Sequence, residues 1–338
     1  MLSDEPYAAV FGPESKARYL TGTLEPRGAL LPRYDAVAHE GLADEIALLS
    51  GQGPTAETAA DCTRYTPIVP SAVGAEEQVL GSGCVYPAST PTLPAQLRAR
   101  HLRWRAYIGG IGEAGSSSSA CAHPALGSED PGSAADSGAG PYATSINPIV
   151  YFASLTAVAS CQRDDVGIGR LQSDLASAAR TPAFSYIAPS RCEDGAPTPC
   201  APSMPAGLAP ADAFLKRVVP QILASKAYRQ NGLLVIAVDQ APASGEFADS
   251  SSCCGQPAYP NLPAALSQTP SGRPRGGGSV GALLLSPFIK GPETSQEPYD
   301  HFSLLASIED LFGLKHLGYA ALAAVKPVEA SLFSEVTG

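Results

Sequence analysis

Eight cysteines form four consecutive pairs along the chain, and their spacing constrains the fold more than any other feature of the sequence. Polar, turn-rich sequence lies between the members of most pairs, which predicts disulfides in loops. A structural zinc site is the alternative, but it requires CxxC-type spacing, which the sequence lacks. The predicted disulfides join Cys62 to Cys84, Cys121 to Cys161, Cys192 to Cys200, and Cys253 to Cys254.

Disulfides persist in oxidising compartments, so the protein is expected to be extracytoplasmic, either secreted or periplasmic. The chain nevertheless starts at Met1 without the charged and apolar regions of a signal peptide. We therefore expect a trimmed start, and with it a first strand cut short before Met1. The longest apolar runs, residues 233–238 and 281–285, are far shorter than the roughly 20 residues that span a bilayer, so no transmembrane segment is predicted.

Length and charge limit the class of protein. The 338 residues, 44% of them hydrophobic, can bury a substantial core. No linker or internal repeat divides the chain, so we expect one domain over residues 1–338. Lys and Arg number 22 against 32 Asp and Glu, which gives a formal net charge of -10. Without a basic stripe, such a chain is not expected to bind nucleic acid.

Apolar periodicity predicts helices that alternate with buried strands. Helices are expected at residues 42–49, 93–103, 211–227 and 302–312, and strands at 183–187, 233–238 and 280–285. Gly51 and Gly313 are placed to cap two of these helices. The alternation predicts an α/β fold with a mostly parallel central sheet flanked by helices. A run rich in Ser, Gly and Ala at about residues 112–140 is expected to be an exposed loop.

Polar residues that follow buried strands are the first candidates for a site, because the carboxyl ends of the strands hold the ligand in an open α/β sheet. Asp239 and Asp194 occupy such positions, and Asp4 would do so after a strand that has been cut away. With His301 they would make a hard-metal or zinc site. The alternative is that each aspartate is a turn or cap residue and that His301, at a helix start, is structural.

Other motifs give weaker indications. His39 and His123 are ambiguous between a role in the site and a structural role. Residues 277–281 match the G-x-S-x-G pattern, but the strand follows the serine instead of preceding it, so a nucleophile elbow is not expected. No glycine-rich phosphate loop opens a helix after a strand, and no nucleotide cofactor is implied.

Several strings, in order, carry a resemblance over nearly the whole chain. They are residues 34–51, Cys62 with 81–87, 121–124, 147–148, 232–239, 253–255 and 299–314. Together they resemble the bacterial phosphoesterase family that includes secreted phospholipases C and acid phosphatases, a branch of the alkaline phosphatase superfamily. The resemblance implies an alkaline-phosphatase-like α/β fold with long disulfide-bearing loops. It also implies a divalent metal bound by strand-end carboxylates, and attack on phosphorus by a serine or threonine hydroxyl.

The chain departs from the family pattern at several site positions. The nucleophile position corresponds to Gly41, which has no side chain to attack with. The strand-end Asp-Glu pair of the family corresponds to Asp239 and Gln240 in this chain. Of the family's His-Asn-Pro-Phe string, only Asn147 and the following proline remain. The resemblance leaves two sets of site residues. Those expected to ligate a metal are Asp4, Asp194, Asp239 and His301, and the further candidates are His39, His123, Asn147 and Gln240.

Two hypotheses follow. The first is a metal-dependent phosphoesterase that uses zinc, calcium or manganese and acts on a small phosphate ester or a lipid head group, with water or an unrecognised residue as nucleophile. The second is a catalytically inactive relative that binds a ligand or another protein outside the cytoplasm. The substituted positions keep both open.

Overall fold

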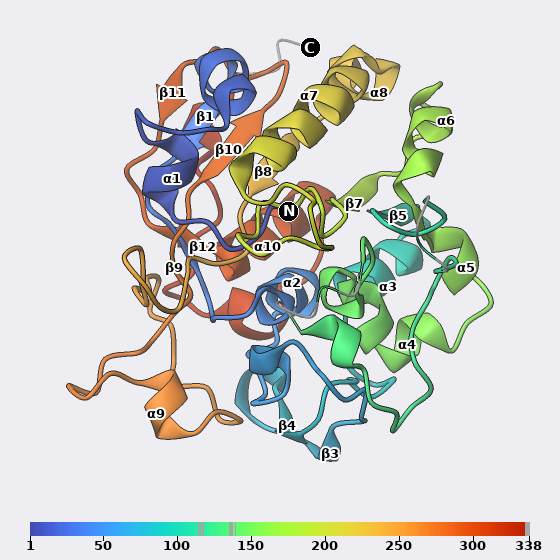
Figure 1. The fold of residues 1–338 in the computed structure, drawn as a ribbon, viewed down its shortest axis with the longest axis vertical. Helices are drawn as coiled ribbons and strands as arrows, with labels where there is room; N and C mark the ends of the chain where they lie inside the picture. Colours follow the sequence, from blue (N-terminus) through green and yellow to red (C-terminus); the bar gives the residue numbers. More distant parts are fainter. Residues whose placement is uncertain (114–115, 117, 135–137, 139, 335–338) are drawn as a thin grey trace.

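The computed structural model describes residues 1–113, 116, 118–134, 138 and 140–334. Its centre is a sheet in two hydrogen-bonded parts, with helices packed around it (Figure 1). One part has the strand order β11–β1–β10–β8 and the other the order β6–β5–β7. Their bounds are Glu293–Thr294, Ala29–Leu31, Ala282–Leu285 and Leu234–Ala237 for the first, and Asp165–Gly167, Trp104–Ile108 and Phe184–Ala188 for the second.

Residues 1–3 lie between the two parts of the sheet. Leu2 bridges Val238 in parallel, and its N–H donates to the Ala237 carbonyl at 2.8 Å. On the other side, the Met1 ammonium donates to the Ile187 carbonyl at 2.8 Å. The N-terminal residues therefore connect β8 to β7, and this places Asp4 directly at the sheet.

The predicted α/β class is confirmed, with one departure from the expected strand directions. β5 is parallel to both β6 and β7, and β1 is parallel to β11. β10 is antiparallel to both β8 and β1, whereas the sequence alternation predicted a parallel strand there. The apolar run predicts that the strand is buried, but it carries no information on the direction of the strand.

Two small sheets flank the centre. β12 (Tyr299–Asp300), β2 (Tyr34–Ala36) and β9 (Gly278–Ser279) form one of them, and β3 (Val69–Val73) with β4 (Val79–Ser82) forms a hairpin. The helices are α1 (Tyr7–Phe11), α2 (Gly41–Ser50), α3 (Leu93–Ala99), α4 (Ala153–Thr156), α5 (Cys161–Asp164), α6 (Leu171–Leu175), α7 (Leu208–Ala224), α8 (Lys226–Asn231), α9 (Ala264–Ser267) and α10 (His301–Phe312).

The helix ends follow local chemistry. Gly51 adopts a φ of 67° after α2 and its N–H donates to the Ala47 carbonyl, and Gly313 adopts a φ of 62° after α10, as glycine caps should. The helix predicted over 211–227 is two helices, because Ser225 leaves the helical conformation and caps α8 through the Tyr228 N–H. The helix predicted over 93–103 ends at Ala99, just before β5.

All four predicted disulfides are present. Cys192 and Cys200 close a short loop that contains Asp194, and Cys121 and Cys161 tie the 112–140 region to α5. In that region, residues 114–115, 117, 135–137 and 139 lie outside the described part of the chain, and most of the others are exposed or half-buried. No helix among the described residues is long and apolar enough to cross a membrane.

Candidate functional site

Asp239 occupies the carboxyl end of the central sheet, directly after β8 and Val238. Its own N–H donates to the Leu2 carbonyl at 2.9 Å, and its Oδ1 accepts the Asp4 N–H at 3.0 Å. The side chain is buried, with 4% of the residue exposed. The pairing between residues 1–3 and β8 therefore brings Asp4 and Asp239 together at one edge of the sheet, as the sequence predicted for strand-end carboxylates.

Asp194 reaches the same edge from the loop after β7. Its carbonyl accepts the Ser3 N–H at 2.8 Å, and its Oδ1 accepts the Ala196 N–H at 2.9 Å. It is 5% exposed. The Cys192–Cys200 disulfide closes the loop around it, and the Asp194 carbonyl holds that loop against the N-terminal segment.

The start of α2 completes this edge. A Cβ atom built on Gly41 would lie 2.2 Å from Asp239 Oδ2 and 2.8 Å from Asp239 Cγ. The carboxylate thus fills the space that any side chain at position 41 would need, and only glycine fits beside it in this arrangement. Gln240 Oε1 accepts the Glu40 N–H at 2.6 Å, which fixes the turn into the helix.

A further aspartate belongs to this edge although the sequence analysis passed over it. Asp61 is buried, has a φ of 51°, and accepts the Leu42 N–H at 3.4 Å through Oδ1. It therefore caps the first turn of α2 from outside the helix. The only sequence signal was its place next to Cys62, a predicted disulfide cysteine. We refer to Asp4, Asp61, Asp194 and Asp239 as the acidic cluster.

Burial raises the pKa of every member of the acidic cluster, and repulsion from Asp239 adds to the rise for the other three. Burial, followed by repulsion from Asp239 and other carboxylates, raises the pKa of Asp4 to about 7. Burial raises the pKa of Asp194 to about 7 and that of Asp239 to about 6. Burial and repulsion from Glu40 and Asp239 raise the pKa of Asp61 as well. So much negative charge at one edge favours the uptake of protons or of a cation.

His301 lies in the core, apart from the predicted aspartate ligands. It is fully buried, its ring packs against Tyr34 at 5.2 Å, and its Nδ1 lies 3.9 Å from Asp44 Oδ1, beyond hydrogen-bond distance. Burial lowers the pKa of His301 to about 3, so the ring is neutral. The structure thus places this histidine in the core behind α2, where neither ring nitrogen has a hydrogen-bond partner among the described residues.

The other candidates lie in three places. Gln240 borders the acidic cluster, as described above. His39, also near the start of α2, has both ring nitrogens engaged, Nδ1 with the Ala241 carbonyl at 3.2 Å and Nε2 with Ser250 Oγ at 2.9 Å. His123 is exposed and stacks on Tyr65.

Asn147 is fully buried and has a structural partner. Its side-chain N–H₂ donates to Asp165 Oδ2 at 2.9 Å and to the Tyr142 hydroxyl at 3.3 Å. Burial raises the pKa of Asp165 to about 7, and the Asn147 hydrogen bond opposes that rise. The side chain therefore pairs with one oxygen of a buried carboxyl group in the β6 region, and Asp165 Oδ1 has no hydrogen-bond partner among the described residues.

Compact groups of potential metal ligands lie elsewhere in the described part of the chain. In the described residues, two groups of three potential ligands lie within 4.8 Å of one another, Cys121 with Cys161 and Asp165, and Cys253 with Cys254 and Asp300. Their cysteines form disulfides and offer no thiolate. The predicted metal ligands are in neither group. The acidic cluster supplies the oxygen donors that a hard cation prefers, in an arrangement more open than a closed coordination shell.

Comparisons with known proteins identify the family and the fold. The family model of the Phosphoesterase family matches residues 1–315. The fold is similar to that of an alkaline phosphatase superfamily protein from Vibrio parahaemolyticus, with a TM-score of 0.50 and 10% identity over 97% of this chain and 69% of that one. The lipoteichoic acid synthase LtaP from Listeria monocytogenes gives a TM-score of 0.48 and 11% identity over 94% of this chain and 72% of that one.

No curated protein sequence matches the chain significantly. At such low identity the solved structures show a shared fold and nothing about substrate. The match to the family model, in contrast, covers most of the chain. The chain therefore belongs to the Phosphoesterase family and has the fold of the alkaline phosphatase superfamily.

Proposed function

We propose that this chain is a phosphoesterase that works at the acidic cluster and hydrolyses its ester by direct attack of water, without a covalent phospho-enzyme. One observation carries the proposal. The position that corresponds to the family nucleophile is Gly41, and Asp239 Oδ2 lies 2.2 Å from where its Cβ would be. A carboxylate oxygen therefore lies close to the place that the side chain of a serine or threonine nucleophile would occupy. A carboxylate in that place can activate water as a general base.

The neighbouring carboxylates suit the two proton transfers. Water attacks phosphorus while its proton passes to Asp239, and the bond from phosphorus to the leaving alkoxide breaks. The alkoxide takes a proton from Asp4, which is half-buried and so more accessible than Asp194. With a pKa raised to about 7, Asp4 is protonated in part of the molecules at neutral pH and can act as the acid.

We also propose that a divalent cation binds at the acidic cluster, held by Asp194 and Asp239, while Asp4 keeps the proton that it gives to the leaving group. When bound, it would neutralise the oxygens of the phosphoryl group. These donors are all carboxylate oxygens, which favours calcium or manganese over zinc, because zinc sites usually include nitrogen or sulfur ligands. His301 is buried in the core, and both ring nitrogens of His39 have protein partners.

The test is release of p-nitrophenol from p-nitrophenyl phosphate and from bis-p-nitrophenyl phosphate, with calcium or manganese added. Asp239→Asn keeps the shape of the side chain and removes its basicity, so we expect the rate to fall at least about a hundredfold, the usual contribution of a general base. Glu14→Gln removes a charge from an exposed residue that is not among the charges acting on the cluster carboxylates, and it should leave the rate unchanged. Equal rates for the wild type and Asp239→Asn would contradict the proposal.

Binding without turnover is a second candidate function, and one observation favours it. Asp239 is 4% exposed, and the predicted metal ligands do not form a compact group of three within the described residues. Substrate water would have little access to Asp239 unless the edge opens. Calorimetry separates the two functions, because cation binding that depends on Asp239 with no phosphate release at any pH would select binding alone.

The disulfides support a compartment for this activity. Four crosslinks that use every cysteine fit a protein that folds and works in an oxidising, extracytoplasmic environment, on a soluble phosphate ester or a lipid head group. Thiol titration of the denatured protein, purified without reductant from an oxidising compartment, should detect no free thiol. Stoichiometric free thiols in that preparation would contradict this assignment.

A further inference from the structure

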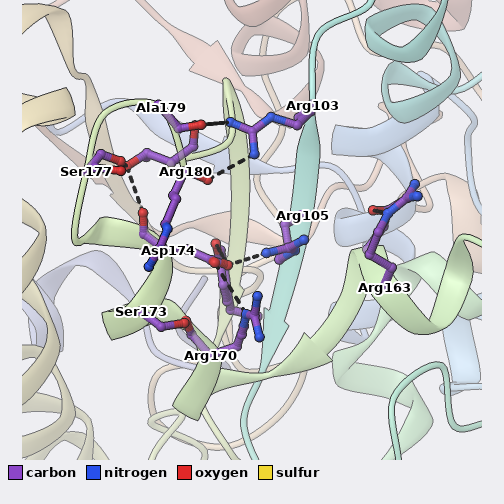
Figure 2. Close-up of polar contacts among 12 residues, drawn as sticks. Arg103, Arg105, Arg163, Arg170, Ser173, Asp174, Ser177, Ala179 and Arg180 are labelled. Carbon is purple, nitrogen blue, oxygen red and sulfur yellow. Dashed lines mark hydrogen bonds and ion pairs between the residues drawn. The ribbon is translucent and has the colours of Figure 1, made fainter.

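A second polar site lies at the other end of the parallel strands. A cavity of about 380 Å³ is lined by four arginines, one serine and one aspartate: Arg103, Arg105, Arg170, Arg180, Ser173 and Asp174. The arginines come from the start of β5, the end of the turn before α6, and the segment before β7. Figure 2 shows their side chains around Asp174, with Arg163 set apart from them.

Asp174 anchors the floor of this cavity. It is buried and accepts hydrogen bonds from Arg105, from Arg170 at 3.3 Å and from the Tyr107 hydroxyl at 2.9 Å (Figure 2). Burial alone would raise the pKa of Asp174, but the hydrogen bonds from Arg105 and Tyr107 hold it below its ordinary value. The carboxyl group is therefore ionised, and four guanidinium groups against one carboxylate leave three positive charges in excess at this cavity.

Several of the arginine donors remain available. Arg170 contacts Asp174 through Nε, which leaves its two terminal nitrogens unused by that pair. Arg105 Nε is buried and has no hydrogen-bond partner among the described residues. The Arg180 guanidinium is exposed and, within the part of the chain that the structure describes, forms no hydrogen bond or ion pair. Arg103 instead holds the turn by donating to the Ala179 carbonyl at 2.5 Å.

We propose that this arginine cavity binds the dianion of a phosphate monoester or of inorganic phosphate. Guanidinium groups present planar forks of donors that match phosphate oxygens, and several of them around one anion are typical of phosphate recognition. A chain with a formal net charge of -10 repels anions overall. Three positive charges gathered from separate segments are therefore a local exception.

The cavity is distinct from the acidic cluster. Arg103 and Arg105 lie at the amino end of β5, and Arg180 precedes β7, which runs parallel to β5. Asp194 lies beyond the carboxyl end of β7. The two sites thus lie toward opposite ends of the same strands, and the arginine cavity should work whether or not the acidic cluster binds a cation.

Titration calorimetry with inorganic phosphate, at low salt and with EDTA present to remove divalent cations, tests the proposal. Arg180→Gln removes donors without breaking a hydrogen bond or ion pair within the described residues, and phosphate binding should weaken by about tenfold or more. Arg163→Gln is the matched control, since Arg163 pairs with Asp164 at 2.9 Å outside the cavity lining. Asp239→Asn should bind phosphate like the wild type, which separates this proposal from the proposed function.

The outcomes are distinct. Binding that Arg180→Gln weakens and Arg163→Gln preserves supports the cavity. No binding by the wild type at millimolar phosphate, or equal binding by the wild type and Arg180→Gln, would overturn it. Vesicles of phosphatidylcholine with phosphatidic acid then identify the source of the phosphate: sedimentation that depends on Arg180 indicates a lipid, and phosphate binding without sedimentation indicates a soluble ester.

Discussion

The contact between Gly41 and Asp239 can be measured as a coupling energy. In Gly41→Ala, the new Cβ would lie 2.2 Å from Asp239 Oδ2 and 2.8 Å from Cγ, so the carboxylate must move out of its hydrogen bond with the Asp4 N–H. Forcing an extra methyl group into a packed site costs about 1–3 kcal/mol. A glycine at a helix start would otherwise gain about 0.4–1 kcal/mol from replacement by alanine.

The double-mutant cycle isolates this clash. In an Asp239→Ala background, the nearest remaining atom is Cβ at 3.4 Å, an ordinary contact, so Gly41→Ala should become neutral or slightly stabilising. The expected coupling is about 1–3 kcal/mol in the free energy of unfolding, measured by urea denaturation with the disulfides intact. Gly22→Ala is the control, because a Cβ on Gly22 meets nothing within 4 Å.

If Gly41→Ala changes the free energy of unfolding equally in both backgrounds, Asp239 does not occupy the space beside position 41. The proposed general base beside Gly41, the position that the family resemblance assigns to the nucleophile, would then lose its basis. A destabilised Gly22→Ala would show that helix glycines in this chain resist alanine for other reasons.

Three further predictions concern the acidic cluster and the crosslinks. Burial raises the pKa of Asp4 from 3.8 to about 7, so between these pH values the folded protein holds a proton that the unfolded chain releases. Without cations, the free energy of unfolding of the wild type, measured by urea denaturation, should therefore fall relative to that of Asp4→Asn as the pH rises from about 4 to about 7. Calcium or manganese should raise the melting temperature of the wild type at pH 8 and leave that of Asp239→Asn unchanged, and equal shifts would place the cation elsewhere. Replacing Cys62 and Cys84 with serine opens a loop with a sequence separation of 22 and should cost about 3 kcal/mol of unfolding free energy, whereas an unchanged denaturation midpoint would show that the crosslink is dispensable.

Local patterns predicted the elements better than their arrangement. The apolar positions and the terminal glycine predicted α2 and α10 within a residue or two, since both signals are local. Cysteine order predicted the disulfides, because neighbouring pairs close the shortest loops. The direction of β10 could not be predicted, because an apolar strand reads the same in either direction.

The site shows where sequence reasoning ends. Three strand-end aspartates were expected at one edge, and the structure gathers Asp4, Asp194 and Asp239 there. His301 follows a short strand and begins a helix, a position that is equally consistent with a ligand and with a core residue. In the structure, the ring of His301 is buried in the core and packs against Tyr34. The arginine cavity left no sequence signal, because its residues come from segments far apart in the chain.

The most direct test of the central claim is the stereochemical course at phosphorus, followed with a substrate made chiral by sulfur and oxygen isotopes. Direct attack of water is one displacement, so the account predicts net inversion in the presence of calcium or manganese. A covalent phospho-enzyme requires two displacements and gives retention. Retention would contradict the role assigned to Asp239 at the Gly41 position, and the absence of turnover with either cation would leave binding as the function of the acidic cluster.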